Sequence, residues 1–163
     1  MGPESTGKST LAKALADHFQ TIWVKEYARE YIDSLTRPYN QEDLTHIAMG
    51  QLKLENKLLP KANRLLICDT NLLVIKIWSD YKYGHCDPGI LHELESRNYD
   101  LHLLTNIDIP WQDDPQREHP NLRQYFYNLY LKELQNRDLK YKEIMGDEDQ
   151  RISSAVSELN TLL

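Results

Sequence analysis

The feature that most constrains this chain lies at its beginning, where residues 2–9 read Gly-Pro-Glu-Ser-Thr-Gly-Lys-Ser. This stretch fits the phosphate-binding pattern G-x-x-x-x-G-K-[ST], the Walker A motif or P-loop, without a gap. In such a loop the backbone N–H groups of a glycine-permitted turn surround a polyphosphate. Lys8 is expected to reach the β and γ phosphates, and the Ser9 hydroxyl to coordinate Mg²⁺. The remaining nucleotide contacts are expected from the rest of this segment: Gly2, Glu4, Ser5, Thr6, Gly7 and Thr10.

The alternative is a Gly/Ser-rich tail of no consequence, and the residues that follow decide against it. Apolar side chains repeat at helical spacing from Leu11 to Phe19, so the loop is predicted to open into an amphipathic helix that adds its dipole. A phosphate loop normally follows a buried strand, yet only Met1 precedes Gly2. We therefore expect the first strand to be missing here, either encoded upstream, cut away or supplied by another chain.

Composition indicates a globular protein of ordinary size. The 163 residues are 40% hydrophobic and 27% charged, and the net charge is −6. A negative balance argues against a general nucleic-acid or anionic-membrane surface, but not against a nucleotide in a loop with its own local field. Two cysteines, Cys68 and Cys86, suggest neither a disulfide framework nor a metal site. Without a recognisable leader or an apolar run of membrane length, the sequence predicts a cytoplasmic protein.

Short apolar strands alternate with helical patterns along the whole chain. Strands are expected at 21–25, 64–69, 100–105 and 140–145, with helical stripes between them and a closing helix from Ile152. This alternation predicts a three-layer α/β P-loop fold of the nucleoside- and nucleotide-kinase type, with a parallel sheet between helices. No repeat or linker interrupts it, so a single domain spanning 1–163 is expected.

Two acidic residues follow predicted strands and are candidates for catalysis. Glu26 comes directly after 21–25, and Asp69 ends the apolar run Arg64-Leu-Leu-Ile-Cys. The carboxyl ends of parallel strands are where ligands gather, so either acid can serve as general base, and Asp69 can also hold Mg²⁺. Arg29 is a candidate phosphate or carboxylate clamp. The competing interpretation of Glu26 and Arg29 is an ordinary exposed helix face.

The segment after the third predicted strand has the composition of a kinase lid, at about 109–123. Asp108 is a candidate acceptor for ribose hydroxyls, and Trp111 can stack on a flat ring, although it can equally anchor the loop by contacting a proline. Arg117 and Arg123 bracket the lid and can neutralise a transferring phosphoryl group, unless one of them is a surface residue. Residues 146–151, ending in Arg151, form the turn that in this architecture wraps the adenine.

Three segments together resemble nicotinamide-riboside kinase domains: residues 2–9, Glu-Tyr-Ala-Arg-Glu-Tyr at 26–31, and Thr-Asn-Ile-Asp-Ile-Pro-Trp-Gln-Asp-Asp at 105–114 followed by Arg117. The particular kin are bacterial domains that form the C-terminal part of bifunctional NAD-salvage proteins, in which an adenylyltransferase domain can precede them. The resemblance covers nearly the whole chain in the same order. The first motif is generic to P-loop proteins, whereas the other two are more specific.

The resemblance implies transfer of phosphate from ATP, with Mg²⁺, to the 5′-hydroxyl of nicotinamide riboside, giving nicotinamide mononucleotide. It implies that Lys8 and Ser9 serve phosphate and Mg²⁺, that Asp69 and the 26–31 segment, including Tyr27, lie on the riboside side, and that Trp111 lies near the nicotinamide ring. Two alternatives stay open: a kinase for another nucleoside or small alcohol, and a non-catalytic ATP-binding sensor module.

Overall fold

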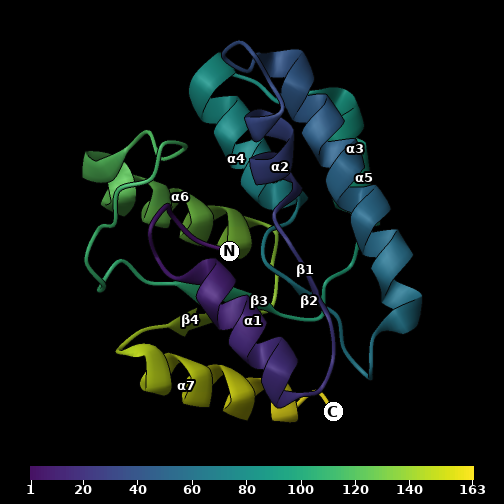
Figure 1. Ribbon diagram of the computed structural model, residues 1–163, viewed down its shortest axis with the longest axis vertical. Helices are drawn as coiled ribbons and strands as arrows, with labels where there is room; N and C mark the ends of the chain where they lie inside the picture. Colours follow the sequence, from purple (N-terminus) through teal and green to yellow (C-terminus); the bar gives the residue numbers. More distant parts are fainter. The chain divides into compact units, whose positions relative to one another are not determined.

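The computed structural model describes all 163 residues, 1–163, which divide into two compact units. Unit 1 consists of Met1–Gln20 together with Tyr99–Leu163, and unit 2 consists of Thr21–Asn98. The ribbon in Figure 1 follows the chain from its purple N-terminus to its yellow C-terminus. None of the helices is both long and apolar enough to cross a membrane.

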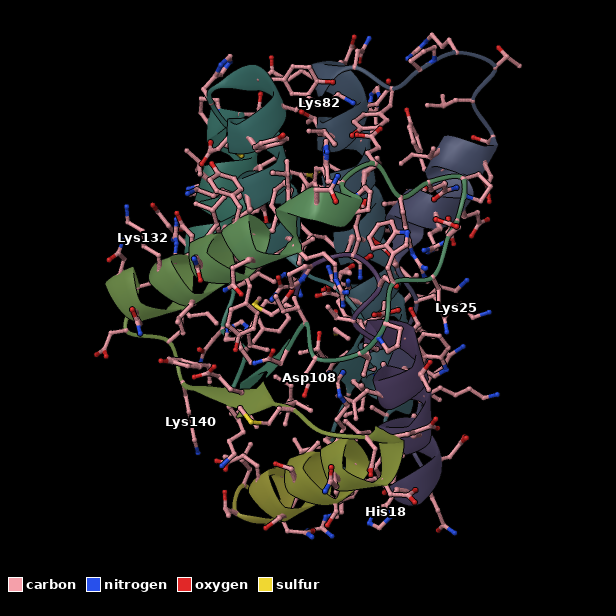
Figure 2. All side chains as sticks on the ribbon, turned by 90° about the vertical axis from the view of Figure 1, so that its left-hand side faces the viewer. His18, Lys25, Lys82, Asp108, Lys132 and Lys140 are labelled. Atoms are coloured by element: carbon pink, nitrogen blue, oxygen red, sulfur yellow. The ribbon has the colours of Figure 1, made fainter.

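Unit 1 is built on two parallel strands. Strand β3 (His102–Thr105) pairs with β4 (Tyr141–Ile144) over four residues. Both views show these strands between helix α6 on one side and helix α7 on the other (Figures 1 and 2). The helical elements of this unit are α1 (Lys8–His18), η2 (Pro120–Leu122), α6 (Arg123–Asn136) and α7 (Glu148–Asn160).

Met1 continues the pairing of unit 1 on the other edge of β3. Its amino group donates to the carbonyl of Leu103 at 2.8 Å, and its own carbonyl accepts from the N–H of Thr105 at 2.9 Å. These two bonds flank Leu104, which is the pattern of a parallel bridge. The phosphate loop is therefore fixed to β3 through Met1.

Helix α7 begins earlier than the sequence indicates. Asp147 caps it by accepting from the N–H of Gln150 at 2.9 Å, while the Gln150 side chain accepts from the N–H of Asp147 at 3.0 Å. This capping box starts the helix at Glu148. The prediction that the turn after the last strand extends to Arg151 is thus wrong, and Arg151 lies in the first turn of α7.

His102 makes the stability of unit 1 depend on pH. It is only 5% exposed, and burial, with the positive N-terminus as a second cause, lowers its pKa from 6.5 to about 4. Between these two values the unfolded chain binds the proton and the folded chain does not, so stability falls as pH falls from 6.5 to 4 and is flat below. We expect a loss of about 3 kcal/mol over this window. Urea unfolding at several pH values between 4 and 6.5 gives the free energy of unfolding, which should depend less on pH in His102→Phe than in the parent. An equal pH dependence would contradict the lowered pKa of His102.

Unit 2 has one parallel strand pair and most of the helices. Strand β1 (Trp23–Val24) pairs with β2 (Ile67–Cys68), with Trp23 opposite Ile67 and Val24 opposite Cys68. The helical elements are α2 (Tyr27–Asp33), α3 (Gln41–Leu58), η1 (Leu59–Lys61), α4 (Leu72–Tyr83) and α5 (Pro88–Ser96). Helix α3 contacts α2, α4 and α5, so it is the centre of this unit (Figure 1).

The predicted start of α3 at Asn40 is confirmed by a capping box. Asn40 accepts from the N–H of Asp43 at 3.1 Å, and Asp43 accepts from the N–H of Asn40 at 2.7 Å. Arg37 donates to both carboxylate oxygens of Asp43, and Tyr31 donates to one of them. The Arg37 guanidinium is the largest cause holding the pKa of Asp43 well below its usual range, followed by the Asn40 backbone bond. Asp43 therefore links the start of α3 to the segment before it.

The α/β P-loop fold predicted from the sequence is confirmed, as is the parallel direction of its strands. Each strand is shorter than its apolar run: the segments at 21–25 and 64–69 each contribute two residues. The strands form two separate pairs, each within its own unit, instead of one continuous ladder.

Candidate active site

The phosphate loop passes very close to β3, and its first glycine is required for this approach. Gly2 has φ 141°, and a Cβ placed on it would lie 2.5 Å from Oγ1 and 2.8 Å from the carbonyl oxygen of Thr105. Gly7 also has a positive φ, 74°, directly before α1. Thus the two fixed glycines of the motif occupy backbone conformations that other residues adopt only with strain.

Hydrogen bonds within the loop hold it against β3. The Thr6 hydroxyl donates to the carbonyl of Pro3 at 2.7 Å and lies 2.7 Å from the Thr105 hydroxyl. Lys8 reaches back across the loop, and its Nζ donates to the same Pro3 carbonyl at 2.7 Å. Because α1 starts at Lys8, the loop leads directly into the positive end of the helix dipole. A glycine loop, a lysine and a helix N-terminus together make an anion-binding site.

Arg151 joins the loop to the ends of both strands of unit 1. Its Nη1 donates to the carbonyl of Thr6 at 2.7 Å, its Nη2 to that of Asn106 at 3.0 Å, and its Nε to that of Gly146 at 2.8 Å. It also forms an ion pair with Asp108 and is 5% exposed. The nucleotide-binding role of Arg151 stays a prediction; in this structure its guanidinium fixes the loop backbone.

Asp108 has protein partners for both carboxylate oxygens. Oδ1 pairs with Arg151, and Oδ2 accepts from the N–H of Gly146 at 2.6 Å; Asp108 is labelled in Figure 2, above α7. Burial works to raise its pKa, but the bonds from Gly146 and Arg151 outweigh it, and the net shift is downward. The carboxylate therefore stays charged, and a ribose hydroxyl could bind it only alongside these partners or in place of them. Its predicted substrate role stays a prediction.

The two lid arginines contact the loop in different ways. Arg123, the first residue of α6, donates through Nη2 to the carbonyls of Ser5 at 3.0 Å and Ile109 at 2.9 Å, while its buried Nε has no hydrogen-bond partner. Burial, followed by the nearby charge of Arg151, lowers the pKa of Arg123. It thus serves as a partly buried anchor between the loop and the lid.

Arg117 contacts one lid carbonyl and one side chain of the loop. Its Nη1 donates to the carbonyl of Gln112 and lies 3.4 Å from the hydroxyl of Ser5. The guanidinium carbon is 5.9 Å from the centre of the Trp111 ring, at the outer limit of a cation–π contact. The indole N–H of Trp111 donates to Asp113 at 2.8 Å. One of the two Arg117 bonds, to Gln112, is exposed, whereas both Arg123 bonds are partly buried.

Of the predicted substrate residues, Asp108 and Trp111 belong to unit 1, whereas the others belong to unit 2, where Glu26 and Asp69 lie at the carboxyl edge of the strand pair. Glu26 follows β1, and Asp69 follows β2 with its N–H donating to the carbonyl of Val24 at 3.0 Å. Because the strands are parallel, both acids leave the same edge. Glu26 is 3.5 Å from Arg29, and Asp69 is 3% exposed. The structure thereby brings the two candidate bases to one edge of this unit.

Gln51 is a site-shaping residue that the sequence reasoning missed. It is 1% exposed; its amide oxygen accepts from the N–H of Tyr27 at 3.0 Å, and its amide nitrogen donates to the carbonyl of Thr70 at 3.4 Å. It therefore links the segment carrying Glu26 to the segment carrying Asp69. The Tyr27 ring itself packs on Gly50, where an added Cβ would lie 2.0 Å from a ring carbon. A polar residue in the apolar stripe of α3, four positions after Ile47, was the available signal.

Replacing Gln51 by methionine should destabilise unit 2, because the N–H of Tyr27 and the carbonyl of Thr70 lose a buried partner. We expect a loss of about 1–3 kcal/mol in the free energy of unfolding. Urea unfolding of Gln51→Met, beside Lys53→Met at an exposed position of the same helix, separates the lost bonds from the change of side chain. Equal stability of the two variants would show that Gln51 does not hold these segments.

A glycine-strained loop that runs into a helix N-terminus beside parallel strands defines the class of P-loop nucleotide-binding proteins. Comparison with known proteins gives the family. Residues 1–151 match the AAA domain family, and the chain belongs to it.

Two curated relatives are the trifunctional NAD biosynthesis/regulator proteins NadR of Salmonella typhimurium and Escherichia coli. Each is 26% identical over 152 residues, which cover 88% of this chain and 37% of the relative. The chain therefore spans little more than a third of the length of these relatives.

Two solved structures share the fold. The crystal structure of NadR protein in complex with NR has a TM-score of 0.81 at 22% identity, covering 99% of this chain and 49% of the other. The structure of NadR protein in complex with NAD and AMP-PNP has a TM-score of 0.72 at 21% identity, covering 96% and 47%. At this level of identity, the structural similarity shows that the chain shares the fold of these proteins.

Proposed function

We propose that this chain is an ATP-dependent kinase that phosphorylates the 5′-hydroxyl of nicotinamide riboside to give nicotinamide mononucleotide. The observation that carries the proposal is the phosphate loop of unit 1. Its backbone leads into the N-terminus of α1, and it is contacted by Lys8 and by the two lid arginines. The similarity to NadR proteins, including a structure in complex with NR, supports this acceptor. The chain would act as one kinase domain over 1–163 with the lid at 109–123, and in longer proteins beside an adenylyltransferase domain.

In the proposed reaction the riboside 5′-oxygen attacks the γ-phosphorus as the bond from that phosphorus to the β,γ-bridging oxygen breaks. The electrons of the broken bond leave with ADP, and the hydroxyl proton passes to a carboxylate. Glu26 and Asp69 are the candidates, and their common strand edge supports both. The protein contributes mainly position and charge, because phosphoryl transfer requires little covalent chemistry from it.

Mg²⁺ would be held by the hydroxyl of Ser9 and the carboxylate of Asp69 together with the phosphates. Both are hard oxygen donors of the kind that Mg²⁺ prefers. No group of three or more His, Cys, Asp or Glu side chains in the chain could hold a metal ion by itself. This fits an ion that arrives with the nucleotide, since Mg²⁺ is usually bound through one or two carboxylates plus substrate phosphates. When bound, the ion neutralises charge that develops on the phosphates.

A panel of ribosides with γ-labelled ATP tests the function. We expect label on nicotinamide riboside, with ADP release that depends on the acceptor. Label on another nucleoside or small alcohol would overturn the acceptor but keep the kinase. Binding of ATP without acceptor-dependent ADP release would identify a sensor module instead.

A further inference from the structure

Two neighbouring residues of the phosphate loop, Glu4 and Ser5, contact the lid through their side chains. Glu4 accepts from two consecutive backbone N–H groups, Glu118 at 3.2 Å and His119 at 3.0 Å. These bonds join residues 114 and 115 positions apart in the sequence. Because the acceptor is ionised, each bond is of the stronger, charge-assisted kind.

Ser5 makes the second connection. Its hydroxyl accepts from the N–H of Gln112 at 2.8 Å, and its Oγ also lies 3.4 Å from Arg117 Nη1. Ser5 itself has φ 54°, in the left-handed region, and is buried. The lid is thus attached to the loop at two points, Gln112 and Glu118–His119, with Arg117 between them.

We propose that Glu4 is a positioning residue that latches the lid to the phosphate loop and so places Arg117 for catalysis. Glu4 and Ser5 occupy variable positions of the motif, and the sequence alone assigned both to the nucleotide. In the structure the carboxylate of Glu4 accepts hydrogen bonds from the lid backbone instead. Because it is negatively charged, it would also be a poor ligand for a polyphosphate. The role in catalysis rests on the proposed kinase function, whereas the latch itself does not.

The latch has a direct physical consequence for Arg117. A residue with both flanking segments fixed loses less conformational freedom when its side chain moves onto a phosphoryl group. Cutting one attachment should leave nucleotide binding by the loop nearly unchanged and reduce the rate of transfer.

Hydrogen exchange of the nucleotide-free chain tests the latch without any activity. In Glu4→Ala the amides of Glu118 and His119 should exchange about tenfold faster or more, because both lose an ionised acceptor. Glu4→Gln, which keeps one carbonyl acceptor, should fall between Glu4→Ala and the parent. Glu118→Ala is the matched control: it removes one negative charge and the 3.7 Å side-chain contact between Glu118 and His119 but leaves the latch N–H in place, so exchange at His119 should stay well below the rate in Glu4→Ala. Parent-like exchange in Glu4→Ala overturns the proposal.

Kinetics then test the catalytic role. Glu4→Ala should lower kcat about tenfold while the KM for ATP changes less than about threefold, with partial recovery in Glu4→Gln. A raised KM at unchanged kcat would place Glu4 on the nucleotide and overturn the proposal. If the parent chain transfers phosphate to no riboside, the proposed function fails, and the exchange experiment still decides whether the latch exists.

Discussion

Lys8→Ala is expected to abolish phosphoryl transfer to nicotinamide riboside while the protein stays folded. Lys8 is the positively charged side chain of the loop. Its Nζ lies 2.7 Å from the carbonyl of Pro3, inside the turn that would surround the phosphates. Removing a charge that acts on the transferring group is expected to lower kcat by at least about 10³-fold. Product formation from labelled ATP measures the effect.

The control for this variant is Lys13→Ala, an exposed lysine five residues further along the same helix. It should keep the parent rate. Lys8 is the first residue of α1 and alanine is a good helix former, so the circular dichroism spectrum should match the parent. Retained transfer in Lys8→Ala would contradict the assignment of residues 2–9 as the phosphate loop.

Local signals in the sequence predicted the local structure well. Asn40 with Asp43 gives the start of α3, and Asn71 caps α4 by accepting from the N–H of Leu73. The glycines of the loop adopt positive φ angles as the motif requires. Such features depend on neighbours within a few residues, so they can be predicted from a single chain.

The long-range contacts of the site could not be predicted in this way. Arg151 bonds to Thr6, 145 positions away, and Glu4 to His119, 115 away. Nothing in the composition around these residues says which distant carbonyl or N–H they will meet, because that depends on how β3, β4 and α7 pack. The loop residues were therefore identified correctly as a motif, while the partners of their side chains came only from the structure.

The start of α7 shows a different limit. Asp147 and Gln150 form a capping pair that the sequence displays, but the acidic run 147–149 resembles a turn. The capping bonds favour helix from Glu148 onward. As a result Arg151 has the rigid position of a helical residue, which suits a group that fixes four separate atoms of unit 1.

Arg117→Gln should give the second large effect: a loss of about 10³-fold in kcat, equivalent to about 4 kcal/mol of transition-state stabilisation, with little change in ATP affinity. An arginine that reaches the phosphoryl group only as charge develops acts on the rate and not on ground-state binding. Its present contacts, to a lid carbonyl and a loop hydroxyl, are at the exposed edge of the site, so their loss should shift the melting temperature by no more than roughly 2 °C.

Arg123→Gln provides the contrast, because Arg123 and Arg117 carry the same charge but differ in their contacts: Arg123 donates to two carbonyls in partly buried bonds, whereas the carbonyl bond of Arg117 is exposed. Arg123 donates to the carbonyls of Ser5 and Ile109. Because both carbonyls would lose a charged donor, Arg123→Gln should lower the free energy of unfolding by about 1–3 kcal/mol, besides any loss of rate. Single-turnover kinetics and thermal unfolding of both variants separate the two roles. If Arg117→Gln loses stability and keeps kcat within tenfold, Arg117 is the structural arginine and the lid acts through Arg123. The split expected here, rate alone for Arg117 and stability with rate for Arg123, follows from which guanidinium can move without leaving a partly buried carbonyl unpaired.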